Sequence, residues 1–344
     1  MKKTYLFIIL VSVCIMLILF IGAKKEKQKE RLVKVGKYEL KIPDKDPSEL
    51  EIALVDMNVV NPFHAKLKAG VDAAAEELGV NAYITGATGW DIDAQINIIE
   101  NMITKKVDGL SVVVIDIPAL TPLIQRALEA GIPTTCFNVD APDSGRLSFV
   151  GEDLYLAGAE TAKALVEYMG EEGKIFISSV SLMAIWSIKR EEGVMSVLNN
   201  YPGIEIVERL NCPGDEQTAY ATLENALLAH PDVNGHISLG ATHYLWSRLL
   251  KNKGIGNINS NNPIYSTGHD LYEEKLHQIE EGWSTVTFGQ NPYEQGYQGV
   301  KQLYDFLTTG DPSVFKEIDT GVFPVDKSNV KEILDRLYDG EPIG

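Results

Sequence analysis

Carboxylate, carboxamide and aromatic side chains recur in this sequence directly after short apolar runs. They are Asn61, Phe63, His64, Asn138, Asp140, Trp186, Asp215, His243, Asp270 and Gln290. A sugar hydroxyl both donates and accepts hydrogen bonds, so carboxylates and amides can pair with it fully. The C–H faces of a sugar ring pack on flat aromatic rings. These residue types therefore predict a binding site for one small sugar.

Some of these residues also have a purely structural interpretation. Asn61 before a proline is typical of a turn that starts a helix. Asp215 and Asp270 precede helical segments, where Asp is a common N-cap. Trp186 has the size of a core residue. The prediction of a site rests on the convergence of all these residues at strand ends.

The sequence lacks the patterns that would indicate catalysis, a cofactor or a metal. Its six histidines include no HExxH or comparable spacing. Neither the serine-nucleophile pattern GxSxG nor the nucleotide patterns GxGxxG and GxxxxGK[ST] occurs. His269 and Asp270 could be an acid–base pair, but neighbours on a strand point to opposite faces. We therefore predict a binding protein that is not an enzyme and holds no cofactor or metal.

Short β-branched runs alternate with amphipathic helical segments from residue 51 onward. The expected strands are residues 52–56, 82–85, 109–115 and 132–137, then 174–178, 205–210, 235–239, 264–267 and 285–288. This alternation implies parallel sheets with right-handed crossovers. Ligands of such sheets bind beyond the carboxyl ends of the strands. The sequence therefore predicts an α/β fold of two doubly wound parallel-sheet lobes, with the polar residues at their facing ends.

Composition limits the possible partners. The 344 residues are 45% hydrophobic and 23% charged, which allows two sizeable cores. The formal net charge of -17 argues against a nucleic-acid partner. Cys14, Cys136 and Cys212 have no metal-type spacing. A Cys136–Cys212 disulfide and two buried free thiols both stay open.

The N-terminus carries an apolar run from Tyr5 to Ala23. Its length is close to the roughly 20 residues that cross a bilayer, so we expect a signal-anchor or transmembrane helix within residues 1–23. A cleaved signal peptide and a lipoprotein processed at Cys14 are the alternatives. Residues 24–50 are highly charged and predict a stalk.

Five short motifs follow or join the predicted strands. They are Asn61-Pro62-Phe63-His64, Gly131-Ile132-Pro133, Val150-Gly151-Glu152-Asp153, Thr267-Gly268-His269-Asp270 and Gln290-Asn291-Pro292. Over about residues 51–326 the chain resembles the type I bacterial sugar-binding proteins, of the ribose, galactose and xylose kind. These proteins share their core with lactose-repressor-like regulators. The resemblance implies that Asp270 and Gln290 contact sugar hydroxyls.

The same resemblance implies a domain organisation. The chain would cross between lobes near Glu152, Gln290 and Thr320, a three-crossing hinge. The N-lobe would contain residues 51–152 plus 291–319, and the C-lobe residues 153–290 plus 320–344. The lobes would close around the ligand. The body would be extracytoplasmic and anchored in the cytoplasmic membrane by a single pass, with an ABC sugar permease or a sensor histidine kinase as membrane partner.

Departures from the family pattern leave the ligand open. Ile188 replaces the first arginine of an Arg-x-Arg-x-x-Gly stretch, and His64 takes an aromatic position. A pentose such as xylose, another monosaccharide, a polyol or an autoinducer are all candidates. A sugar-responsive transcription regulator lacking its DNA-binding domain is the alternative function. An intact regulator predicts a helix-turn-helix at the N-terminus, where this chain has its apolar run.

Overall fold

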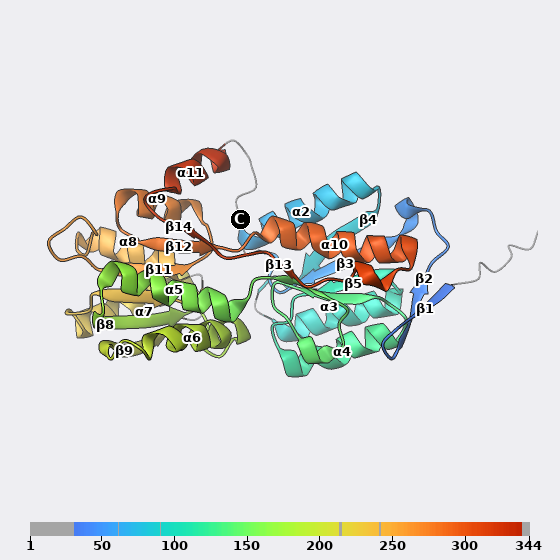
Figure 1. Cartoon of the computed structure of the whole chain (residues 1–344), viewed down its shortest axis with the longest axis horizontal. Helices are drawn as coiled ribbons and strands as arrows, with labels where there is room; N and C mark the ends of the chain where they lie inside the picture. Colours follow the sequence, from blue (N-terminus) through green and yellow to red (C-terminus); the bar gives the residue numbers. More distant parts are fainter. Residues whose placement is uncertain (1–30, 61, 90, 213–214, 241, 339–344) are drawn as a thin grey trace, which may run out of the picture.

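The structure, a computed structural model, describes residues 31–338 except 61, 90, 213–214 and 241. These residues form two α/β lobes that lie end to end along the long axis of the molecule (Figure 1). Each lobe is built on a six-stranded sheet, mostly parallel, with helices on both faces. The predicted architecture of two doubly wound lobes is confirmed. The apolar run expected to form a membrane helix lies outside the described residues.

The N-lobe sheet is parallel at every described pairing. Its strands in spatial order are β13 (Ile318–Asp319), β7 (Phe149–Gly151), β6 (Thr134–Phe137), β5 (Gly109–Val112), β3 (Glu51–Asp56) and β4 (Asn81–Gly86). Helices α2 (Pro62–Leu78) and α10 (Pro292–Thr309) pack on one face, and α3 (Ile92–Lys105) and α4 (Ile117–Glu129) on the other. Because side chains alternate along a strand, Ile52 and Leu54 join the first layer while Ala53 and Val55 join the second.

The C-lobe sheet has the same design with one antiparallel edge strand. Its strands in spatial order are β14 (Phe323–Val325), β12 (Val286–Gly289), β11 (Tyr265–His269), β10 (Gly235–Ser238), β8 (Glu172–Ser179) and β9 (Gly203–Asn211). Its helices are α5 (Leu154–Met169), α6 (Ile185–Leu198), α7 (Glu216–Ala229), α8 (His243–Lys253), α9 (Glu273–Glu281) and α11 (Val330–Tyr338). Helices α5 and α6 cover one face, and α7 and α8 the other.

The chain passes between the two sheets three times, as Figure 1 shows near the middle of the molecule. The first passage joins β7 to α5, the second joins β12 to α10, and the third joins β13 to β14. Hydrogen bonds tie the passages together. The Thr320 amide donates to the Gly151 carbonyl (3.0 Å), and its hydroxyl donates to the Gln290 carbonyl (3.1 Å). The hinge is therefore a bonded bundle of three segments.

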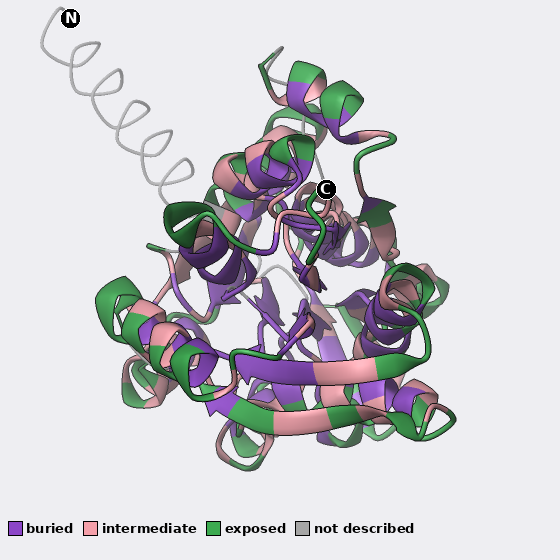
Figure 2. Cartoon of the chain, turned by 90° about the vertical axis from the view of Figure 1, so that its left-hand side faces the viewer, coloured by how far each residue is buried: buried purple, intermediate pink, exposed green. Residues whose placement is uncertain are grey.

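Burial follows the layers. Figure 2 shows buried residues along the strands and the inner faces of the helices, with exposed residues on the outer faces. This is the pattern expected when both faces of a parallel sheet are covered. The strand ends that face the other lobe are thus the places where polar side chains can meet a ligand.

The predicted stalk is corrected for its described part. Residues 31–42 form an antiparallel hairpin of β1 (Arg31–Val35) and β2 (Tyr38–Ile42). Tyr38, Leu40 and Ile42 are buried in the same hydrophobic cluster as α3 and α4. The Lys41 amide also donates to the Gly131 carbonyl (2.9 Å). Alternating apolar residues thus attach this segment to the N-lobe, in spite of its many charges.

Two further predictions bear on the described residues. None of the helices within the described ranges is long and apolar enough to cross a membrane. Cys136 and Cys212 are both buried and free, and they lie in the cores of different lobes. In this structure Cys136 and Cys212 are therefore free thiols and form no disulfide with each other.

Candidate ligand-binding site

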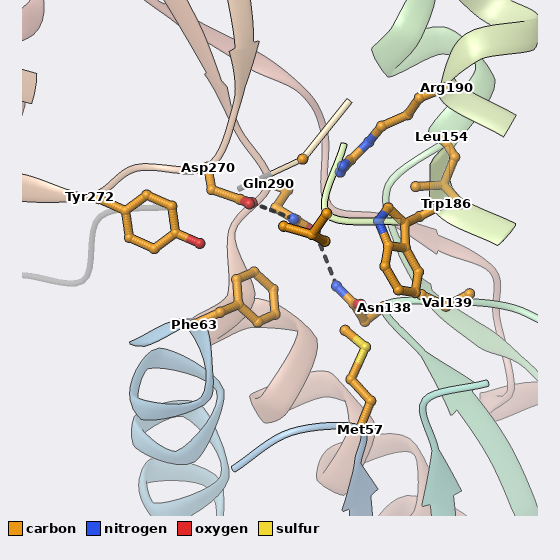
Figure 3. Close-up of a pocket in the computed structure, with 12 residues that line it drawn as sticks. Met57, Phe63, Asn138, Val139, Leu154, Trp186, Arg190, Asp270, Tyr272 and Gln290 are labelled. Atoms are coloured by element: carbon orange, nitrogen blue, oxygen red, sulfur yellow. Dashed lines mark hydrogen bonds between the residues drawn. The ribbon is translucent and has the colours of Figure 1, made fainter. Parts of the chain in front are cut away.

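A cavity of about 60 Å³ lies between the lobes, where the carboxyl ends of both sheets face each other. Five residues predicted from the sequence line it: Phe63, Asn138, Trp186, Asp270 and Gln290. The remaining lining residues are Met57, Val139, Leu154, Val180, Arg190, Gly240 and Tyr272. Figure 3 shows the labelled side chains among them, such as Phe63, Asn138, Trp186 and Asp270, converging from both lobes. The rule that ligands of open α/β sheets bind at strand ends describes this arrangement.

A chain of side-chain amides links the lobes across the cavity (Figure 3). Gln290, on the second crossing, donates from Nε2 to the Asp270 carboxylate of the C-lobe (2.7 Å). Its Oε1 accepts from Asn138 Nδ2 of the N-lobe (3.1 Å). These contacts set the orientation of the Gln290 amide. Asn138, Gln290 and Asp270 are referred to below as the relay.

Two members of the relay have a left-handed backbone. Asn138 has φ of 60° and Asp270 has φ of 68°. Asn and Asp tolerate this conformation better than most residues, and strained positions concentrate at functional sites. The backbone N–H of Asn138 donates to the Val150 carbonyl (2.9 Å), and the backbone N–H of Asp270 donates to the Phe288 carbonyl (2.8 Å). The strand-end backbone thus turns both side chains toward the space between the lobes.

Lys275 holds the backbone around Asp270 in place through hydrogen bonds. Its Nζ donates to the His269 carbonyl, to the Asp270 carbonyl (3.2 Å) and to Thr287 Oγ1 (3.3 Å). The side chain is fully buried, and burial lowers the pKa of Lys275 to about 7. Removal of water disfavours the charged ammonium, while the carbonyl oxygens give it hydrogen-bond acceptors. Lys275 is therefore a structural support for the site.

Arg190 is the cation among the described residues that line this cavity, and the sequence patterns did not predict it. Its Nε lies 3.1 Å from Glu152 Oε1, its Nη2 contacts the same oxygen, and its Nη1 donates to Leu239 O (2.7 Å). Burial raises the pKa of Glu152, and Arg190 opposes that shift. A signal existed, because Arg190 and Gly193 fit the end of the Arg-x-Arg-x-x-Gly stretch whose first position is Ile188.

A close helix contact places Arg190. A Cβ atom at Gly158 of α5 would overlap the backbone carbonyl of Arg190 on α6. Glycine at this position lets the two helices approach closely. The guanidinium is then held at the cavity by Glu152, which lies on the first crossing.

Aromatic rings supply the apolar walls. Phe63 from α2, Trp186 from α6 and Tyr272 from the loop before α9 all line the cavity. Trp186 and Ile185 also pack against the N-lobe cluster that contains Phe137 and Val139. The lobes therefore touch beside the cavity. Burial raises the pKa of the Tyr272 hydroxyl well above its ordinary value, so this group is a neutral donor at physiological pH.

Four predicted residues, namely His64, Asp140, Asp215 and His243, do not line the cavity. His64 pairs with Asp56 (Nδ1 to Oδ2, 2.7 Å). Asp140 forms an ion pair with Arg146 (2.6 Å), and Asp215 is the exposed N-cap of α7, accepting from Thr218 N (2.9 Å). Asn61 lies outside the described residues.

His243 is the fourth, and it lies inside the C-lobe core. Its Nε2 is 2.9 Å from Ser284 Oγ and 3.2 Å from Ser266 Oγ. His236 and His269 are also buried in this lobe, and burial lowers the pKa of all three imidazoles well below the ordinary value, to about 3 for His236. These histidines are neutral core residues.

The arrangement suits binding. Among the described residues, no group of His, Cys, Asp or Glu side chains is placed to hold a metal ion. The described lining residues of the cavity include one cation, one carboxylate, two carboxamides and three aromatic rings. Such a set can pair with hydroxyls and cover C–H faces, which is what a neutral sugar requires.

Comparison with known proteins agrees with this geometry. The family described as "Periplasmic binding protein domain" matches residues 52–312. The xylose/arabinose-binding protein XylF of Sulfolobus acidocaldarius is 27% identical over 305 residues, covering 84% of this chain and 74% of that protein. An ABC transporter solute-binding protein from Burkholderia graminis C4D1M, solved with D-arabinose, is 25% identical with a TM-score of 0.78, covering 83% and 98% of the two chains.

A further solved structure is the XylFII–LytSN complex. It is 24% identical with a TM-score of 0.73, covering 81% of this chain and 98% of that one, and it supports the fold alone. The family match spans most of the chain and includes both lobes and the cavity. This chain therefore belongs to the periplasmic binding protein family, in its type I sugar-binding branch, and is a binding protein rather than an enzyme.

Proposed function

We propose that this protein binds a pentose-sized monosaccharide, such as xylose or arabinose, between its lobes. The relay of Asn138, Gln290 and Asp270 carries the proposal, because it brings hydrogen-bonding groups of both lobes to one cavity with aromatic walls. The names of a xylose/arabinose-binding relative and of a structural relative solved with D-arabinose support a pentose. Phe63 and Trp186 would cover the ring faces, and Arg190, Asp270, Asn138 and Gln290 would pair with hydroxyls.

The mechanism is lobe closure. A ligand that contacts Phe63 and Asn138 on one lobe and Trp186 and Asp270 on the other binds fully only when the lobes meet. Such a ligand stabilises the closed state by its differential affinity for it. The bonded three-segment hinge favours bending as the motion that opens the site.

The membrane anchor is part of the proposal. Residues 1–23 would cross the cytoplasmic membrane once and hold the body in the extracytoplasmic space, where the family acts. The partner would be an ABC sugar permease or a sensor histidine kinase that reads the closed lobes.

A thermal-shift screen of the purified full chain tests the binding proposal. The panel holds D-xylose, L-arabinose, D-arabinose, D-ribose, D-allose, D-galactose, xylitol and nucleosides. A ligand at about 100 times its Kd adds about 2.7 kcal/mol of stability, which gives a clear rise in Tm. A shift with one or a few pentoses supports the proposal, and no shift with any sugar contradicts it.

A deletion of the gene separates the two partner classes. Loss of uptake of the radiolabelled sugar indicates a permease. Unchanged uptake with loss of the sugar-induced transcriptional response indicates a kinase. If both are unchanged, the proposed membrane partner is wrong.

A further inference from the structure

A second cavity adjoins the proposed sugar site. It has a volume of about 160 Å³ and shares Phe63, Asp270, Tyr272 and Gln290 with the first cavity. Its other lining residues are Lys66, Leu271, Glu273, Pro292 and Leu337. The two cavities thus lie side by side and share two relay members and two aromatic rings as lining residues.

The size of the second cavity needs an explanation. A water molecule requires about 10–15 Å³ of such volume, so a cavity of about 60 Å³ already has room for a few waters. The space on the other side of Asp270 is larger, at about 160 Å³. A ligand confined to the first cavity would leave most of the joined space unused.

The lining of the second cavity resembles that of the first in kind. Phe63 and Tyr272 offer aromatic surface, and Leu271, Pro292 and Leu337 add apolar contacts. Lys66 and Glu273 add a donor and an acceptor. Among the described residues that line it, one cation stands against two carboxylates, Asp270 and Glu273. This charge balance disfavours an anionic group and favours a neutral ligand with hydroxyls.

Lys66 is the side chain best placed to read such a ligand. It lies on α2 of the N-lobe, and its Nζ donates to the Leu271 carbonyl of the C-lobe (3.1 Å). An ammonium has three donors, so that contact leaves donors for a ligand. Burial lowers the pKa of Lys66 to about 8, with Asp270 opposing the shift. The group is therefore held in a largely desolvated position at the edge of both lobes.

Resting on the proposed sugar-binding function, we propose that the cavity lined by Lys66, Glu273 and Leu337 is a second sugar subsite. The first residue of a disaccharide would occupy the cavity at the relay. The second residue would pass Asp270, stack on Tyr272 or Phe63, and accept a hydrogen bond from Lys66. The protein thus takes a glycosidically linked sugar as well as the free one.

Isothermal titration calorimetry with matched sugars tests this inference on the full chain. The pairs are D-xylose with xylobiose, L-arabinose with arabinobiose, D-galactose with galactobiose and D-glucose with cellobiose. Both residues of each disaccharide are the same sugar, so either end can offer that sugar to the cavity at the relay, with one hydroxyl position taken up by the glycosidic bond. For the sugar that the protein binds, we expect a disaccharide Kd within about tenfold of the monosaccharide Kd, or tighter.

Two variants address the second subsite without touching the first cavity. Leu337→Trp fills the space from α11, and Lys66→Met removes the donor while keeping the length of the side chain. Each should weaken disaccharide binding by about tenfold or more and leave monosaccharide affinity within about twofold. Lys68→Met is the control, because Lys68 lies on the same helix and faces solvent in a pair with Asp72.

The outcomes separate the two proposals. Binding of a monosaccharide with rejection of its disaccharide overturns the second subsite and leaves the proposed function standing. Equal loss of both ligands in Lys66→Met and Leu337→Trp also overturns it, because it assigns these residues to lobe closure. Binding of none of the sugars contradicts the proposed function itself.

Discussion

Glu152 and Arg190 form a buried ion pair that joins the first interlobe crossing to the wall of the proposed sugar site. Glu152 is 2% exposed and Arg190 is 4% exposed, so the pair has almost no contact with water. Removing one partner of such a pair leaves an uncompensated buried charge. The pair thus links the hinge to a residue that lines the proposed site, and its loss should also lower the stability of the fold.

Replacing Glu152 by Gln should destabilise the protein by about 3–5 kcal/mol, the usual cost of breaking a buried ion pair. Urea unfolding measures the change. The double variant Glu152→Gln with Arg190→Met should be more stable than Glu152→Gln alone, because it removes the orphaned charge. Glu160→Gln is the control, since the exposed pair of Glu160 with Lys163 contributes about 1 kcal/mol or less. A loss in Glu152→Gln no larger than in the control contradicts the role given to this pair.

Replacing Asp270 by Asn should abolish most of the sugar affinity while the fold survives. Asn tolerates the φ of 68° at this position, so the change removes charge without new backbone strain. Losing one charged hydrogen-bonding partner costs about 2–5 kcal/mol, which is about 30-fold or more in Kd. Calorimetry with the best sugar of the screen measures it. Asp215→Asn, at an exposed helix cap, should bind as the wild type does. Unchanged affinity in Asp270→Asn would remove Asp270 from the site.

Acid should destabilise the C-lobe through its buried histidines. His236, His243 and His269 have depressed pKa values in the fold, so below pH 6.5 the unfolded chain binds protons that the folded chain does not. Stability should therefore fall as the pH drops from about 6.5 toward 3, by up to about 1.4 kcal/mol per pH unit for each histidine. Denaturant unfolding at several pH values gives the slope. His243→Gln should make the slope shallower, whereas His277→Gln, at an exposed position, should leave it unchanged. A slope that His243→Gln does not alter would contradict this origin.

Alkali should have the reverse effect through Lys275. Its pKa of about 7 in the fold lies below the ordinary 10.5, so between these values the unfolded chain holds the extra proton. Stability should therefore rise from pH 7 toward 10 by up to about 1.4 kcal/mol per unit from this group. Lys275→Met should flatten that rise, with Lys163→Met as the exposed control. A rise of equal slope in Lys275→Met assigns it to other groups.

The N-terminal hairpin should contribute to stability. Leu40 is fully buried in the cluster of α3 and α4, and truncating a buried leucine costs about 2–5 kcal/mol. Thermal and urea unfolding of Leu40→Ala should show this loss, and Leu32→Ala, at a side chain 54% exposed, should show little change. If the two variants lost the same amount of stability, the hairpin would not pack on the N-lobe and this prediction would be wrong.

The hairpin also shows where sequence patterns are hard to interpret. Tyr38, Leu40 and Ile42 alternate with charged residues as in a half-buried strand. Five residues is a short window, and the surrounding charges suggested a stalk instead. In contrast, the repeated change between β-branched runs and amphipathic helices predicted both lobes, because the alternation persists over the whole body.

The residues that line the cavity were predictable where a strand end alone places them. Asn138, Asp270 and Gln290 follow β6, β11 and β12 directly, and the topology brings those ends together. His243 also follows a strand, yet its side chain turns into the core, because position after a strand does not determine direction. Arg190 lies one turn into α6, so its place at the cavity depends on the helix contact at Gly158 and on the ion pair with Glu152.

The second crossing has a consequence for biosynthesis. Val300 and Leu303 of α10 complete the N-lobe core around Leu54, Leu67 and Val71, but the ribosome makes the C-lobe elements from α5 to β12 before it makes α10. A nascent N-lobe must therefore wait with an open apolar face while the intervening strands emerge. Folding cannot proceed lobe by lobe from the N-terminus, and the waiting intermediate is the species most exposed to aggregation. If the chain stayed unfolded until its synthesis ended, this aggregation-prone intermediate would not form.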